Sequence, residues 1–374
     1  MTQAIQTLRQ NEIMTKQERI DAVFEKQLPD RVPIIDKLRN NRVIEYYTGK
    51  KLTQDNKFEV VTEAIARTLD IVSDAVRFPH ISETQADKDG FVWDYQEWTE
   101  WIQRRPFRDV LGARDFVKQK IKELKKGYSE QNPSWKTQKS IEEIKKLRNR
   151  INQTVIAISS NVGLDAAYHL IGMENFVYLY HDDPCLISEW LELLCKKQVR
   201  RAYYIGPLAE FSYVTVFSDI SSNVGLIFSP SFLEKEFFPR LAKVVEAWNE
   251  NGYTCFFHSD GNLNAIINDL IDSGIKGLHP IEVSAGMDIG EIKNKYGDKL
   301  VLLGGIDCSG LLPNGTPTQV RQAVRKAIQI AGQNGGYVIG STSELHNAIP
   351  PENIIAMFRT VWEYGTYPLN LDWV

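Results

Sequence analysis

The sequence has few cysteines, no long apolar segment and no excess of charge of one sign. Its four cysteines are far apart and form no C-x-x-C pair, and the chain lacks a secretory signal, so we expect a reducing, cytoplasmic environment. The most apolar stretch, residues 214–228, is interrupted by Asp219, and no window approaches the roughly 18 uncharged apolar residues that a membrane span requires. The 44 basic and 48 acidic side chains leave a formal charge of -4, which gives no long-range attraction to nucleic acid or anionic lipid.

The overall composition is typical of a soluble globular chain. Hydrophobic residues make up 43% and charged residues 25%, which argues against long disordered or fibrous regions. A length of 374 residues suits one α/β barrel of roughly 250 residues with additional segments. The sequence leaves open whether two copies of the chain form a homodimer.

Eight short strand-like runs recur along the chain, each followed by a helical pattern. Such alternation is typical of parallel βα units. The runs are residues 32–36, 74–79, 154–160, 213–219, 253–260, 275–281, 299–307 and 336–342. Eight strands alternating with helices predict an α/β fold in which a TIM (β/α)8 barrel closes on itself.

Capping signals mark several of the expected helices. Thr15 followed by Glu18 has the spacing of a capping box, and Thr316 followed by Gln319 repeats it. The last helix is expected to begin near Pro351. Because each signal depends on only a few neighbouring residues, it predicts where a helix begins from local sequence alone.

Residues 83–150 do not fit the alternation. They hold four of the eight tryptophans and a lysine-rich stretch, residues 118–146. We interpret them as a helical, tryptophan-rich insertion between strands two and three of a single domain over residues 1–374, and we expect the insertion to cover the barrel mouth. In the simpler interpretation, the tryptophans pack a small core of the insertion itself and the lysines face solvent.

Polar side chains follow the carboxyl ends of most of the predicted strands. In an α/β barrel these ends surround the active site. The residues concerned are Asp36, His80, Ser218, Asp219, His258, Ser259, Asp260, Glu282, Asp307, Cys308, Ser341, Thr342, Ser343 and Glu344. A single acid at a strand end is often only a helix cap, and Asp307 by itself fits that role equally well. The repetition around the ring predicts an active site for a small-molecule substrate.

The segment 258–262 is the most informative of these strand ends. His258 and Asp260 are two residues apart, so both can point into the mouth and share a metal or a proton. Gly261 allows the backbone to turn tightly after them. In the structural alternative, His258 bonds to its neighbours and Asp260 caps the next helix. His279 fits a structural role as well as a functional one.

Four motifs follow one another in the second half of the chain. They are Phe217-Ser218-Asp219, His258-Ser259-Asp260-Gly261-Asn262, Gly304-Gly305-Ile306-Asp307 and Pro350-Pro351-Glu352-Asn353. In this order and spacing they resemble the uroporphyrinogen decarboxylase superfamily, which includes the corrinoid-linked methyltransferases of the methylcobamide:coenzyme M type. Arg31-Val32-Pro33 and Gly172-Met173-Glu174-Asn175-Phe176 are also similar. The resemblance implies a TIM barrel, in agreement with the eight strands.

The sequence departs from both branches of that superfamily. Of the arginine- and glycine-rich motif with which the decarboxylases bind carboxylates, only Arg39 and Arg42 remain. The aspartate that the decarboxylases have near the end of the second strand falls at residues 78–80, and their late histidine falls on Ser343. The methyltransferases bind zinc through a His-x-Cys pair and a later cysteine. Here Asp260 replaces the first of these cysteines and Ser343 the second, which disfavours thiol activation.

Methyl transfer is the leading hypothesis. The resemblance implies a transferase that moves a methyl group between a small methylated donor and a corrinoid on a partner protein. His258 and Asp260, together with Glu344, are candidates to bind zinc or to protonate the leaving group. Asp219 and Asp307 are expected to orient the substrate. The other predicted substrate-binding residues are Arg39, Arg42, His80, Glu282 and Ser343.

Two alternatives remain. The first is a cofactor-free lyase that decarboxylates a tetrapyrrole-like carboxylate bound by Arg39 and Arg42. In that reaction Asp219 or Asp307 would stabilise positive charge on a ring. The second is a barrel that binds a ligand without catalysis, which the fold alone does not exclude. The many acids at the mouth argue against it, because buried carboxylates without partners are costly.

Overall fold

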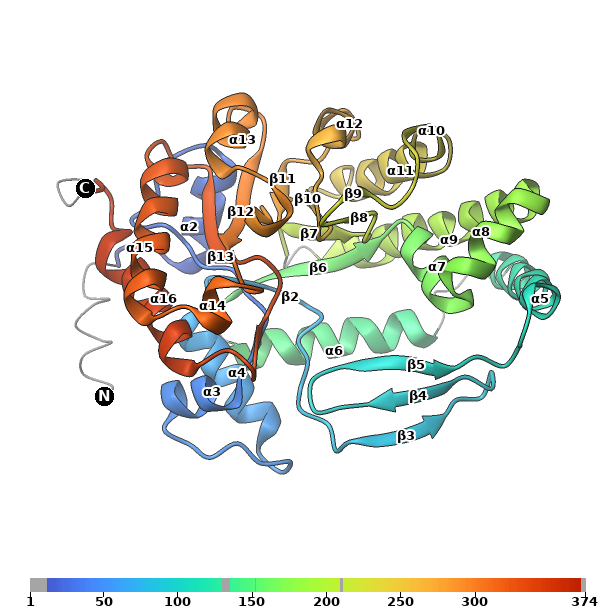
Figure 1. Ribbon diagram of the computed structural model, residues 1–374, viewed down its shortest axis with the longest axis horizontal. Coiled ribbons are helices and arrows are strands. Elements are labelled where there is room, and N and C mark those ends of the chain that lie inside the picture. Colours follow the sequence, from blue (N-terminus) through green and yellow to red (C-terminus); the bar gives the residue numbers. More distant parts are fainter. Residues whose placement is uncertain (1–11, 130–134, 152, 209–210, 371–374) are drawn as a thin grey trace.

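The computed structural model describes residues 12–129, 135–151, 153–208 and 211–370. The ends of the predicted domain over 1–374 and residues 130–134 of the predicted insertion lie outside these described residues. Seven parallel strands form the central sheet in the order β13-β12-β11-β10-β7-β6-β2 (Figure 1). Their bounds are β2 Ile71–Ser73, β6 Val155–Asn161, β7 Tyr213–Phe217, β10 Thr254–His258, β11 Gly277–His279, β12 Val301–Ile306 and β13 Tyr337–Ser341.

The segment that precedes β2 joins the two edges of this sheet. Ile34 forms a parallel bridge with Ile339 of β13, and Ile35 forms one with Ile71 of β2. The Ile35 amide donates to the Ile339 carbonyl at 2.9 Å, and the Ile71 amide donates to the Ile34 carbonyl at 3.2 Å. The first predicted strand, residues 32–36, therefore occupies the eighth place in a TIM-barrel-like ring, although it pairs through single bridges.

Both faces of the strands are buried, as in other parallel sheets that helices cover. Val301 and Leu303 of β12 belong to an inner core, and Leu302 between them belongs to an outer core beneath the helices. Helix α2 (Lys16–Phe24) closes the amino-terminal end of the ring, because its Ile20 and Val23 pack into the inner core. Space for a ligand is thereby left to the carboxyl ends of the strands.

Helices surround the ring on its outside (Figure 1). Their bounds are α3 Asn41–Thr48, α4 Lys57–Thr68, α5 Val110–Ser129, α6 Trp135–Ile151, α7 Leu164–Ile171, α8 Met173–Asp182, α9 Pro184–Ile205, α10 Pro230–Phe232, α11 Phe238–Asn249, α12 Ile267–Asp272, α13 Ile289–Tyr296, α14 Leu311–Asn314, α15 Pro317–Ala327 and α16 Pro351–Tyr364. Both predicted capping boxes form, one at Thr15 and one at Thr316, and the last helix begins at Pro351 as expected. In the described residues, no helix is long and apolar enough to cross a membrane.

Strand two was misplaced by the sequence analysis. The structure ends β2 at Ser73, whereas the predicted run was residues 74–79. The Ser159 amide donates to the Asp74 carboxylate at 2.8 Å instead of to a main-chain carbonyl, and Pro79 has no amide to offer. The Asp74 amide still donates to the Ala157 carbonyl at 2.9 Å, and pairing stops before the rest of the predicted run.

The insertion contains a sheet as well as helices, so its description as helical was incomplete. Three antiparallel strands, β3 Glu83–Ala86, β4 Val92–Tyr95 and β5 Glu100–Arg104, precede α5 and α6 (Figure 1). Its tryptophans do not share one core. Trp98 packs into the main core and donates to Asn41 Oδ1 at 2.8 Å, whereas Trp101 is exposed.

Two further strand pairs lie at the carboxyl ends of the barrel strands. β1 (Leu38–Arg39) is parallel to β14 (Leu345–His346). β8 (Ser221–Ser222) and β9 (Gly225–Leu226) form a small hairpin after β7. These pairs hold the loops that surround the barrel mouth.

Candidate active site

A cavity of about 330 Å³ lies at the carboxyl ends of the barrel strands. Because side chains alternate along a strand, Phe256 belongs to the inner core and His258, two residues later, faces the cavity above it. The same alternation places Thr215 and Phe217 of β7 on its wall. The polar residues that line it are Asp36, Lys37, Arg39, Ser73, Arg77, Ser159, Thr215, Asp219, His258, His279 and Ser343. We call this cavity the mouth cavity.

His258 and His279 contact each other directly. They are register partners on β10 and β11, and their Nδ1 atoms are 2.7 Å apart. Burial, reinforced by the nearby Lys37 charge, lowers the pKa of both rings, that of His279 to about 3. Both imidazoles are therefore neutral near pH 7, and one Nδ1 donates to the other.

Acids from three neighbouring strand ends gather beside this pair. Asp260 Oδ1 is 3.8 Å from His258 Nε2, and it has no hydrogen-bond partner among the described residues. The Asp260 amide donates to Asp219 Oδ1 at 3.4 Å, and the Gly261 amide donates to Glu282 Oε2 at 2.6 Å. Burial, with the nearby charge of Asp219, raises the pKa of Asp260 to about 6. This carboxyl can therefore hold a proton close to neutral pH.

Gly261 makes this arrangement sterically feasible. Its φ is +92°, and a Cβ there would lie 2.4 Å from the Ser222 nitrogen. The Asn262 amide donates to the Ser222 carbonyl at 3.1 Å, which ties the loop after β10 to the β8–β9 hairpin. The tight turn expected from the sequence is present, and it holds Asp260 beside His258, which lines the mouth cavity. Asp260 itself is not among the residues that line the cavity.

Two further acids near the mouth are buried. Burial raises the pKa of Asp36 to about 6, and its carboxylate accepts from the Ser341 amide and hydroxyl, each at 2.8 Å. Burial, with the charge of Asp219, raises the pKa of Asp165 to about 7. Ser218 Oγ lies 3.2 Å from Asp165 Oδ1. Asp36 thus anchors the first barrel segment to β13, and Asp165 holds a second proton near the mouth.

Three cationic side chains line the mouth cavity. Arg39 pairs with Glu344, and Arg77 Nη2 is 3.4 Å from Glu100 Oε1 of β5. Lys37 makes no ion pair with any residue that the structure describes, although it lies close enough to lower the pKa of both histidines. Lys37 is therefore the cation that is free to meet an anionic group of a ligand.

Of the other predicted site residues, one lines the mouth cavity and three do not. Ser343 lines the mouth cavity. Arg42 is exposed on α3, 3.6 Å from Glu352, and His80 is exposed beside the insertion, so neither reaches the cavity. The Asp307 carboxylate accepts from three amides of the loop before α14, at 2.8 to 3.2 Å. This geometry matches the capping role that the sequence also allowed for Asp307.

The three candidate zinc ligands do not form one ligand set, although His258 and Asp260 are neighbours. Glu344 is paired with Arg39, and the Nδ1 atom of His258 contacts His279. In the described part of the chain, no three His, Cys, Asp or Glu side chains form a group that could hold a metal ion. The residues present do not fit a zinc site.

Sequence reasoning missed Lys37, Arg77 and Asp165 as residues of this site. Lys37 directly follows the predicted strand end at Asp36. Its position therefore indicated a place at the mouth, but only acids, histidines and hydroxyl residues were considered at that strand end. Arg77 lay inside the misplaced strand. Asp165 begins a helix, and nothing in the local sequence shows that it is buried beside Asp219.

A family model described as uroporphyrinogen decarboxylase (URO-D) matches residues 113–364. The match extends from α5 to α16 and includes the ends of β7, β10, β11, β12 and β13. No curated protein sequence matches the chain.

Comparison with solved structures supports the same architecture. A methyltransferase from Methanosarcina mazei superposes with a TM-score of 0.67 at 17% identity, over 94% of this chain and 99% of that one. At this identity the likeness shows the fold alone. A xylanase B from Clostridium stercorarium F9 (TM-score 0.35, 11% identity, 58% of this chain and 74% of that one) is too distant to carry an argument. The same holds for a GH18 chitinase from Flavobacterium johnsoniae (TM-score 0.38, 10% identity, 89% and 94%).

Proposed function

Because the chain belongs to the uroporphyrinogen decarboxylase family, we propose that it is a methyltransferase that moves a methyl group from a small methylated donor to a corrinoid carried by a partner protein. One observation carries the proposal. The Asp260 carboxyl, with a pKa of about 6, lies without a described hydrogen-bond partner beside the neutral His258 at the mouth cavity. The likeness of fold to a methyltransferase along almost the whole chain supports it.

The residues of the mouth can supply the proton that methyl transfer requires. When the bond between the methyl carbon and the donor oxygen breaks, the departing oxygen carries negative charge unless it is protonated. Protonated Asp260 donates that proton as a general acid. The neutral state of His258 matters, because a charged imidazolium at this distance would lower the pKa of Asp260. The Asp260 side chain is 46% exposed, so the carboxylate regains its proton from solvent.

The rest of the mouth cavity binds and orients the donor. Val72, Phe217 and Phe256 give it apolar walls that exclude water from the reacting bond. Lys37 is placed to bind an anionic group of the donor. Asp219 accepts from the Asp260 amide and so fixes the direction of the acid.

The reduced corrinoid of the partner would supply the nucleophile that accepts the methyl group. The partner would approach the end of the barrel where the mouth cavity lies. Val224 and Ile227 follow β7, Val283 follows β11, and all three are exposed at the end of the barrel where the mouth cavity lies. These three side chains are candidates for that contact, although none of them lines the mouth cavity.

We further propose that the insertion closes one side of the mouth. Glu97, in the turn between β4 and β5, accepts from the side-chain amide of Asn41 at 2.6 Å and from that of Asn347 at 2.9 Å. Glu100 of β5 pairs with Arg77 on the cavity wall. These contacts support a role of the insertion in shaping the site.

The test uses free cob(I)alamin in place of the corrinoid protein and follows methylcobalamin formation by absorbance. Methanol and 4-methoxybenzoate, whose methyl groups are bound to oxygen, serve as donors. We expect the wild-type protein to methylate cob(I)alamin with at least one donor, and Asp260→Asn to be slower by about 10²- to 10⁴-fold, the usual contribution of a general acid. Asp55→Asn, at an exposed position that does not line the mouth cavity, is the matched control and should retain the wild-type rate. A wild-type rate in Asp260→Asn would contradict the proposal.

The cations of the mouth favour one second candidate, a decarboxylase. Lys37, Arg39 and Arg77 line the cavity and could bind carboxylates of a tetrapyrrole-like substrate, whereas Arg42 lies outside it. Release of carbon dioxide from uroporphyrinogen III, lost in Arg39→Ala and retained in Arg42→Ala, would establish this candidate. Ligand binding without turnover in either assay would leave the non-catalytic barrel.

A further inference from the structure

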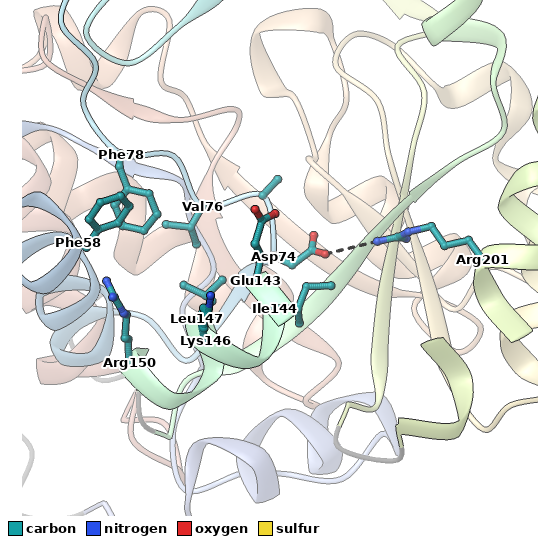
Figure 2. Close-up of a pocket in the computed structure, with 11 residues that line it drawn as sticks. Phe58, Asp74, Val76, Phe78, Glu143, Ile144, Lys146, Leu147, Arg150 and Arg201 are labelled. Carbon is teal, nitrogen blue, oxygen red and sulfur yellow. Dashed lines mark ion pairs between the residues drawn. The ribbon is translucent and has the colours of Figure 1, made fainter. Parts of the chain in front are cut away.

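A second cavity of about 590 Å³ adjoins the mouth cavity, and the proposed reaction does not use it. Ala75 and Val76, in the segment after β2, line both cavities. Figure 2 shows its lining side chains, which come from α4, this segment, α6 and α9. Its volume is within the range of about 300 to 1,000 Å³ that is common for small-molecule sites.

One end of this second cavity is aromatic and apolar. The rings of Phe58 and Phe78 lie 4.7 Å apart at an angle of 54°, and the Arg150 guanidinium lies 5.3 Å from the centre of the Phe58 ring. Ile144 and Leu147 of α6 form the adjoining wall (Figure 2). A flat apolar group of a ligand can pack here against two rings and two aliphatic side chains.

The opposite end holds the guanidinium of Arg201, a side chain that is 20% exposed and has unused donors. Arg201 Nη1 donates to the Ser159 carbonyl at 2.5 Å, and its Nη2 points toward Asp74 (Figure 2). The distance from Nη2 to Asp74 Oδ2 is 3.8 Å, which is too long for a hydrogen bond. The Asp74 carboxylate instead accepts from the Ser159 amide at 2.8 Å. No further hydrogen bond joins Arg201 to a described residue, so its remaining N–H groups are available to a ligand.

The charges around the second cavity favour an anion. Three cations, Lys146, Arg150 and Arg201, line it against two acids, Asp74 and Glu143. Burial lowers the pKa of Arg201, which means that its charge lacks full compensation in the free protein. A carboxylate that bonds to a guanidinium in a poorly hydrated site makes a charge-assisted hydrogen bond, which is stronger than a neutral one.

We propose that the second cavity is a binding site for an aromatic carboxylate, whose rings pack against Phe58 and Phe78 and whose carboxylate bonds to Arg201. The site is separate from the proposed methyl transfer, because none of its charged residues lines the mouth cavity. It shares the segment that carries Ala75 and Val76 with that cavity, so a bound ligand would touch the wall of the mouth.

Isothermal titration calorimetry with 2-naphthoate and its neutral isostere 2-naphthamide tests the proposal on the full-length protein. We expect one saturable site for 2-naphthoate and at least about tenfold weaker binding of 2-naphthamide, because the amide lacks the charge that Arg201 requires. Arg201→Met should weaken 2-naphthoate binding by at least about tenfold. Leu147→Trp, which fills the cavity without removing a charge, should abolish it.

Lys37→Met is the matched control for the neighbouring cavity, since Lys37 lines only the mouth. It should bind 2-naphthoate as the wild type does. Circular dichroism and thermal melting of each variant confirm that it is folded. The proposal is overturned if 2-naphthoate does not bind, if folded Leu147→Trp or Arg201→Met binds it with unchanged affinity, or if Lys37→Met loses the binding.

Discussion

At the scale of single residues, the mouth contains groups whose protonation is set by burial. Burial and the charge of Asp219 raise the pKa of Asp260 from 3.8 to about 6, whereas burial lowers the pKa of His279 to about 3. The pKa of Asp260 is therefore higher than that of His279, whereas a free carboxyl has a lower pKa than a free imidazole. The sequence predicted that His258 and Asp260 converge, but it could not predict this reversal, which depends on the depth of the site.

The raised pKa of Asp260 predicts a specific dependence of stability on pH. Between roughly pH 4 and pH 6 the folded protein holds a proton that the unfolded chain releases, so the free energy of unfolding falls as the pH rises through this window. Asp260→Asn cannot ionise and avoids this loss. Its melting temperature should exceed that of the wild type near pH 8 and equal it near pH 4, as thermal melts at the two pH values would show. A difference of the same size at both would mean that ionisation of Asp260 is not the cause.

At the scale of elements, a buried ion network ties α2 to β2 at the amino-terminal end of the barrel. Asp70, directly before β2, accepts from Arg19 of α2 and from Arg31, with both nearest contacts at 2.7 Å. Its carboxylate also accepts from the Ile34 amide at 2.8 Å. These contacts hold the pKa of Asp70 well below its usual range in spite of burial. The network lies opposite the mouth, where conserved geometry in barrels serves stability rather than chemistry.

Asp70→Asn is therefore expected to destabilise the protein by about 1 to 3 kcal/mol, because it weakens charged hydrogen bonds to two buried guanidinium groups. The cost stays below that of a fully unpaired charge, since Arg19 keeps Asp30 and Arg31 keeps Glu12. Urea unfolding at pH 7, followed by circular dichroism, measures the change. Asp55→Asn is the control and should stay within about 0.5 kcal/mol of the wild type. A cost below about 1 kcal/mol for Asp70→Asn would show that the network contributes little.

The elements also show what local sequence can and cannot specify. Capping boxes at Thr15 and Thr316 depend on residues three apart, so they were predicted correctly. The end of β2 depends on a bond between Asp74 and Ser159, which are far apart in sequence, so the strand was misplaced. In the insertion, a helical pattern was predicted, but the three short strands that precede the lysine-rich helices were not.

At the scale of the whole molecule, the ring of eight segments could be predicted from the sequence. Strand-like runs alternate with helical patterns along the chain, and polar residues follow most of these runs. The two cavities could not be predicted, because their walls combine segments whose packing only the folded chain reveals. Arg42 and Arg39 illustrate the limit. They are three residues apart in sequence, yet Arg39 lines the mouth cavity and Arg42 faces solvent beside Glu352.

If protonated Asp260 is the general acid of methyl transfer, its ionisation sets how kcat/KM for the methylation of cob(I)alamin depends on pH. We expect kcat/KM of the wild type to fall about tenfold for each pH unit above a pKa of about 6. Asp260→Asn should be slow at every pH and show no such fall. A wild-type kcat/KM that does not change between about pH 5 and pH 8, or the same fall in Asp260→Asn, would contradict this role of Asp260.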